Sequence, residues 1–106
     1  MQIYRYQSED GTEPVTDWLG RLRDKRAQAR IRIRLKRLAT GNFGDCRPVG
    51  SGVLELRIDV GPGYRVYLAR HGDAVVLLLC GGDKRSQPTD IKRAHQLWAN
   101  WKRRQP

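Results

Sequence analysis

The residues best suited to chemistry in this sequence are basic side chains that lie near glycines in its second half. Arg57 and Arg65 fall in two consecutive strand-like segments, and Lys84 and Arg85 follow the pair Gly81-Gly82, whose amides can approach a phosphate closely. A guanidinium group holds two phosphate oxygens in a planar fork and stabilises the extra charge of a phosphorane-like transition state. In RNA the substrate's own 2′-hydroxyl supplies the nucleophile. These residues therefore predict phosphodiester binding, and cleavage driven by orientation and charge neutralisation.

The common catalytic and metal-binding sets are missing from the sequence, which contains no nucleophile elbow, phosphate-binding P-loop or histidine-rich metal motif. Its two histidines fall in a predicted turn (His71) and inside a predicted helix (His95), and we expect neither to have a catalytic role. Neither Cys46 nor Cys80 has metal-ligand spacing, and Cys80 lies in an apolar segment where a buried, inert thiol is expected. The sequence predicts no metal and no cofactor.

A sheet must position the basic residues. Three strand-like segments cover residues 54–60, 64–70 and 74–80, and tight turns at 61–63 and 71–73 connect them. The first two segments alternate polar and apolar residues, whereas the third is apolar throughout, as in a central strand covered on both faces. This alternation places Arg57, Arg65 and Tyr67 on one face, which we expect to stay partly open.

The rest of the chain predicts a strand over residues 1–7 and three helices. The first helix starts after a Thr12 cap, and the last starts at Ser86 or Gln87. The segment 24–40 also alternates like a strand, but its length, its lack of breakers and its stop at Thr40-Gly41 favour a helix. Apolar residues at helical spacing in the first and last helices are interpreted as core; they are Val15, Trp18, Leu19 and Leu22, then Ile91, Ala94, either Leu97 or Trp98, and Trp101.

These elements predict an α+β fold in the order β-α-α-β-β-β-α. We expect a mainly antiparallel four-stranded sheet with the helices packed on one face. The two-helix connection lets the first strand enter the sheet beside a non-consecutive neighbour. The 106 residues suit a single domain over 1–106, with a basic C-terminal tail at about 102–106.

The charge of the chain favours a polyanionic partner. Lys and Arg number 21 against 11 Asp and Glu, which gives a net charge of +10. The second helix carries a basic stripe at helical spacing, consisting of Arg26, Arg30, Arg34 and Arg37. Like charges four residues apart repel, so this stripe is better explained by an anionic ligand than by solvation alone. We predict that these arginines bind RNA together with Arg47, Arg57 and Tyr67, while a solubilising surface or an acidic protein partner stays an alternative.

The segments GVLELRID, GPGYRVYLAR and LLLCGGDKRSQ resemble the RelE/ParE superfamily of bacterial toxins, in particular its phage-related, HigB-like addiction-module killer group. The resemblance covers nearly the whole chain. It implies a small RelE-like fold and a cytoplasmic, metal-independent endoribonuclease that cleaves mRNA on the ribosome and inhibits translation. It also implies a cognate antitoxin, typically a small helix-turn-helix DNA-binding protein.

The resemblance extends to individual residues. Arg65 matches the RelE arginine after Gly-Tyr, Lys84 and Arg85 match its basic pair after the last strand, and Arg57 matches its basic residue late in the preceding strand. Two positions depart from the pattern: Glu55 replaces a lysine, and a residue near Ile91 replaces a tyrosine. The identity of any general acid or base is therefore open.

Two other classes of function compete with the nuclease. One is a ParE-like toxin that poisons DNA gyrase without cleaving RNA, and the other is a basic nucleic-acid-binding protein without toxicity. No apolar run reaches the roughly 20 residues of a membrane span, and no signal-peptide core is present, so we expect an intracellular, soluble protein without membrane contact.

Overall fold

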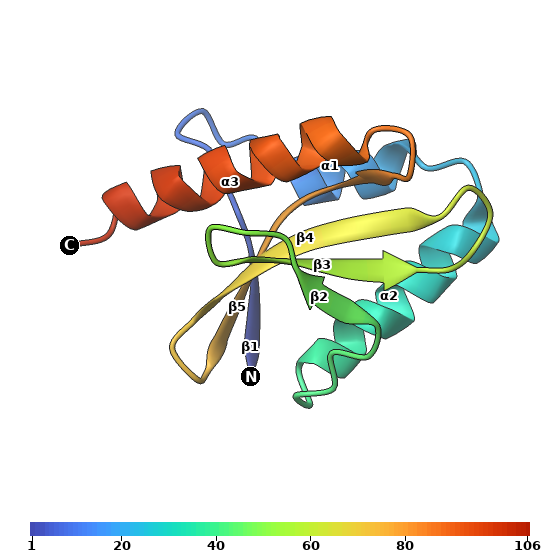
Figure 1. Cartoon of the computed structure of the whole chain (residues 1–106), viewed down its shortest axis with the longest axis horizontal. Helices are drawn as coiled ribbons and strands as arrows, with labels where there is room; N and C mark the ends of the chain where they lie inside the picture. The colour runs from blue at the N-terminus through green and yellow to red at the C-terminus, as the bar shows by residue number, and fades with distance from the viewer.

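The computed structural model describes all of residues 1–106 (Figure 1). In chain order the elements are β1 (Gln2–Arg5), α1 (Pro14–Arg21), α2 (Lys25–Leu38), β2 (Cys46–Pro48), β3 (Val53–Ile58), β4 (Tyr64–His71), β5 (Val75–Asp83) and α3 (Gln87–Arg103). The α+β class and the three helices agree with the prediction. None of the helices has the length and apolar character that a membrane crossing requires.

The sheet has five strands in the order β1-β5-β4-β3-β2, rather than the four predicted. Strands β2 to β5 pair antiparallel with their neighbours, whereas β1 pairs parallel with β5. The first strand therefore does lie beside a non-consecutive neighbour, and the sheet is mixed. The additional strand, β2, contributes only three residues, including Pro48 at the sheet edge, which is too short for a period-2 pattern to be visible.

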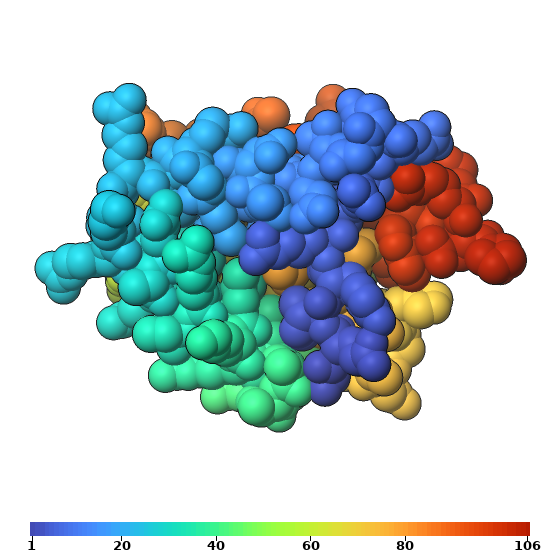
Figure 2. Space-filling view, turned by 180° about the vertical axis from the view of Figure 1, so that it is seen from behind, coloured from blue at the N-terminus to red at the C-terminus, as the bar shows by residue number.

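Helices cover both faces of the sheet, which corrects the prediction of one covered face. Helices α1 and α2 pack on the face formed by Leu56, Ile58, Val66 and Leu68, whereas α3 packs on the opposite face. In the view from behind, α1 and α2 cover most of the sheet, with β1 beside them (Figure 2). The second layer is needed because β4 and β5 carry apolar residues on both faces over most of their length.

The ambiguous second segment is a helix, as predicted. Its side chains Ala27, Ile31 and Leu38 are completely buried, at the spacing of one helical face. Asp24 is its N-cap and accepts hydrogen bonds from the amides of Arg26 and Ala27. In a strand, alternate residues would face the sheet, and Ala27, Ile31 and Leu38 would not all lie on one side.

The other two helix starts differ in detail from the sequence interpretation. Helix α1 begins at Pro14 with Glu13 at the N-cap position, so Thr12 does not cap it. Ser86 occupies the N-cap position of α3, but its hydroxyl donates to the Asp90 carboxylate and makes no cap hydrogen bond. The first two residues of the predicted basic tail are helical, because α3 extends to Arg103, and the last three lie beyond the helix.

The pair Gly81-Gly82 serves packing, which corrects the prediction that its amides approach a phosphate. Both glycines are buried within β5. A Cβ added at Gly81 would lie 2.3 Å from the ring of Trp18 in α1, and one at Gly82 would lie 1.8 Å from the carboxylate of Asp90 in α3. The missing side chains therefore let one helix on each face approach the backbone of the same strand.

The two cysteines differ in environment, and we expect them to differ in reactivity. Cys80 is completely buried, as predicted, and burial raises its pKa to about 12. Cys46 is partly exposed, although burial raises its pKa as well. Because the thiolate is the reactive form, a disulfide reagent at pH 8 should modify Cys46 slowly and Cys80 only after denaturation. Thiol titration of the native and guanidinium-unfolded protein measures this, with Cys80→Ala as control; equal rates for both native thiols would contradict it.

Candidate functional site

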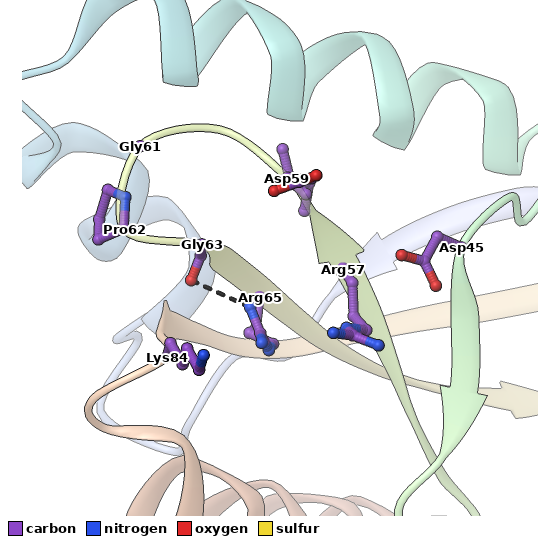
Figure 3. A pocket seen from close by; sticks show the side chains of 9 residues that line it. Asp45, Arg57, Asp59, Gly61, Pro62, Gly63, Arg65 and Lys84 are labelled. Carbon is purple, nitrogen blue, oxygen red and sulfur yellow. Dashed lines mark hydrogen bonds between the residues drawn. The ribbon is translucent and has the colours of Figure 1, made fainter.

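An open pocket of about 310 Å³ lies at the end of the sheet where the β3–β4 turn meets the end of β5 (Figure 3). Its size is at the lower end of the range of about 300–1,000 Å³ found for ligand sites. Three cations line it, Arg57, Arg65 and Lys84, together with the carboxylates of Asp45 and Asp59. The structure thus brings together three of the residues that the sequence predicted to contact a phosphate.

Arg57 and Arg65 are directly opposite each other on β3 and β4, as the strand alternation predicted. Like charges in this position are unfavourable in a sheet. Arg57 has no carboxylate oxygen within 4.0 Å, so no internal ion pair neutralises its guanidinium. Its backbone is fixed instead: its amide donates to the Asp45 carbonyl at 2.9 Å, and its carbonyl accepts from Arg34 Nη1 at 2.7 Å.

Arg65 is almost completely buried, with 5% of its surface exposed. Its Nη1 donates to the carbonyl of Gly63 at 3.1 Å. Gly63 has φ +82, and a Cβ on it would lie 3.2 Å from Arg65 Nη1. A glycine is therefore needed here, both for the turn conformation and for the close approach of the guanidinium.

Lys84 follows β5 and projects into the pocket beside Arg65 (Figure 3). It is exposed and has no ion-pair partner. Arg85, predicted to act with it, does not line the pocket; its side chain is 88% exposed and lies 3.6 Å from the Asp83 carboxylate. Lys84 and Arg85 are adjacent in the sequence, but only Lys84 lines the pocket.

A second hollow, of about 480 Å³, continues the pocket along α2. The two share the lining residues Asp45, Arg57, Ile58 and Asp59. From α2 come Arg30, Arg34 and Arg37, three of the four predicted stripe residues, while Arg26 is exposed outside the hollow. Arg34 also has a structural role, because its guanidinium donates to the carbonyls of Arg57, Phe43 and Asp45.

Tyr67 and Arg47 are held by Glu55, which was not among the predicted site residues. Glu55 is completely buried; its carboxylate accepts from Arg47 Nε at 3.1 Å, Tyr67 Oη at 3.0 Å and Gln87 Nε2 at 2.7 Å. Tyr67 is itself completely buried under α3 and does not reach the pocket, so the expected open face is closed here. Burial, and then the neighbouring Glu55 carboxylate, raise the pKa of Tyr67 above its ordinary value. The register of β3 and β4 places Glu55 opposite Tyr67, and this pairing is the sequence signal that could have revealed their contact.

The histidines lie outside the pocket. His71 is exposed at the end of β4, with its ring 5.0 Å from that of Trp101, and His95 bonds through Nε2 to the Val49 carbonyl at 2.9 Å. No three side chains of the His, Cys, Asp or Glu type gather as metal ligands would. The chemistry available in the pocket therefore comes from fixed positive charge and from the carboxylates of Asp45 and Asp59.

An uncharacterized protein of Haemophilus influenzae (strain Rd) is 55% identical to this chain over 80 residues, which are 76% of this chain and 81% of the relative. The chain belongs to the family of that protein. No family model matches the sequence. That relative is itself uncharacterized, so it assigns no activity to the pocket.

Proposed function

We propose that the chain is the toxin of a type II toxin–antitoxin system, a cytoplasmic endoribonuclease that cleaves mRNA bound to the ribosome. The observation that carries the proposal is the convergence of Arg57, Arg65 and Lys84 in one open pocket, where Arg57 and Lys84 have no carboxylate partner. Unneutralised cations at one point are expected for a site that binds a phosphate. The resemblance to RelE-like toxins supports the assignment of cleavage to this pocket.

In the proposed reaction the 2′-oxygen of the substrate bonds to phosphorus and the bond to the 5′-oxygen breaks. The 2′-hydroxyl loses a proton to solvent, and the leaving oxygen gains one. Arg65 and Lys84 would stabilise the charge that develops on the non-bridging oxygens, and Arg57 would hold the adjoining phosphate. Since Arg65 is fixed by Gly63, little reorganisation is needed when the charge appears.

The arginines of α2 extend the proposed contact. Arg30 and Arg37 line the hollow that continues from the pocket, so the phosphate backbone beyond the scissile bond, or ribosomal RNA, would lie against this helix. The same positive surface would bind the cognate antitoxin, expected to be a helix-turn-helix DNA-binding protein. Neutralisation follows if the antitoxin covers the pocket.

Lys84→Ala tests the site with little risk to the fold, because Lys84 is exposed and makes no ion pair. After induction in a bacterium, wild type should stop growth and produce new mRNA 5′ ends detectable by primer extension. Lys84→Ala should lose both effects, whereas Lys92→Ala, which removes an exposed lysine of α3, should behave as wild type. Intact mRNA in arrested wild-type cells would contradict the proposal.

A ParE-like toxin that poisons DNA gyrase is the second candidate. One observation favours it: no histidine or tyrosine lines the pocket, so proton transfer has only carboxylates and Lys84 to use. DNA-damage filamentation with intact mRNA after induction would identify this function. Normal growth of the induced cells would favour a non-toxic nucleic-acid-binding protein.

A further inference from the structure

The buried carboxylate of Glu55 connects four elements immediately behind the pocket. Its Oε2 accepts from Tyr67 on β4 and Gln87 on α3, and its Oε1 accepts from Arg47 on β2. Glu55 itself lies on β3 with no exposed surface. It is the only completely buried charged side chain of the protein.

Stability alone does not explain a carboxylate at this position. Burying a charge is costly, and replacement of a buried ion pair by well-packed apolar residues is often neutral or stabilising. The neighbouring positions Leu56 and Tyr67 show that this part of the sheet accommodates large apolar or aromatic side chains. A nearby group whose position depends on the charge of Glu55 would account for the carboxylate.

That group is the guanidinium of Arg65. Its Nε lies 3.7 Å from Glu55 Oε1, which is within ion-pair distance but too far for a hydrogen bond. This Nε is the one buried side-chain nitrogen or oxygen without a hydrogen-bond partner. At the other end Nη1 is held by Gly63, while Nη2 makes no hydrogen bond within the protein. The charge of Glu55 and the carbonyl of Gly63 thus fix Arg65 with donors left unused at the pocket.

We propose that Glu55 is a positioning residue for the phosphate site: its buried charge directs the Arg65 guanidinium toward the pocket. Tyr67 and Gln87 hold that charge in place, so the first turn of α3 is coupled to the arginine. The inference rests on the proposed function of the pocket as a phosphate site.

Whether Glu55→Gln strengthens or weakens the binding of an anion separates a positioning role from a purely electrostatic one. Glu55→Gln removes a negative charge close to the pocket, so charge alone would strengthen the binding of an anion. Positioning predicts the opposite, because an amide turns a donor toward Arg47 or Arg65 and no longer attracts the guanidinium. Asp59→Asn is the matched control, since it removes an exposed carboxylate that lines the same pocket.

The experiment measures the affinity of the purified protein for a fluorescein-labelled oligoribonucleotide at low salt by fluorescence anisotropy. We expect Glu55→Gln to bind about tenfold more weakly than wild type, and Asp59→Asn to bind as tightly or about twofold more tightly. Binding by Glu55→Gln that equals or exceeds wild type would overturn the inference. If wild type does not bind, or Lys84→Ala binds like wild type, the phosphate site itself fails, and the inference with it.

Two further measurements keep the inference testable if Glu55→Gln does not fold. Tyr67→Phe keeps the charge of Glu55 but removes one of its hydrogen bonds, and should weaken binding by about threefold. In ¹H–¹⁵N spectra the Arg65 Nε resonance should move in Tyr67→Phe and stay in place in Asp59→Asn. A purely structural Glu55 would lower the melting temperature of Tyr67→Phe without moving that resonance or the affinity, which would overturn the inference.

Discussion

Arg65→Ala should abolish growth arrest and lower RNA cleavage by about 10²- to 10³-fold, the usual loss when one preorganised donor to a developing oxyanion is removed. The expectation rests on the proposed nuclease activity and on the fixed position of Arg65 beside Lys84 in the pocket. The fold should survive, because Glu55 keeps its hydrogen bonds from three other side chains. Primer extension after induction, together with the thermal unfolding of the purified variant, measures both parts of the prediction.

Two arginine variants sharpen this test. Arg85→Ala removes the neighbouring predicted catalytic arginine, which is exposed outside the pocket, and should keep most of the activity. Arg65→Lys keeps the charge but loses the planar fork, so we expect an activity between those of wild type and Arg65→Ala. Full toxicity of Arg65→Ala, or equal losses in Arg65→Ala and Arg85→Ala, would count against the assignment of the site.

The sequence predicted those parts of the site that depend on local periodicity. Period-2 alternation and a short turn were enough to place Arg57 opposite Arg65, and Lys84 at the end of β5. The position of Arg85 was not predictable, because the direction of a side chain in a loop depends on contacts such as the one with Asp83. Tyr67 was assigned to the correct face of the sheet, but α3 covers that face at its position.

The sequence did indicate that both faces of the sheet are covered, although the predicted fold placed all helices on one face. Residues 74–80 are apolar throughout, which by itself requires cover on both sides of the sheet. Amphipathic patterning shows that α3 has a buried face, but not which side of the sheet receives it. The parallel pairing of β1 with β5 and the short edge strand β2 depend on the same tertiary information.

Gly81→Ala should destabilise the protein by about 3 kcal/mol, the upper part of the usual range for overpacking. The new Cβ would lie 2.3 to 2.6 Å from three ring atoms of Trp18, and this ring also packs edge-on against Tyr64 with the centroids 6.2 Å apart. The rigid indole cannot move aside by changing a terminal torsion. Thermal unfolding should show a melting temperature lower by at least roughly 10 °C.

The matched control for Gly81→Ala is Gly20→Ala in α1, where an added Cβ would meet no atom within 4 Å. Because alanine favours a helix over glycine, this variant should gain about 0.5–1 kcal/mol of stability. Replacing Trp18 by leucine in the Gly81→Ala background should recover part of the loss, since the smaller side chain removes the clash. If Gly81→Ala unfolds at the wild-type temperature yet loses RNA binding, the glycine acts at the phosphate after all, and the packing explanation is wrong.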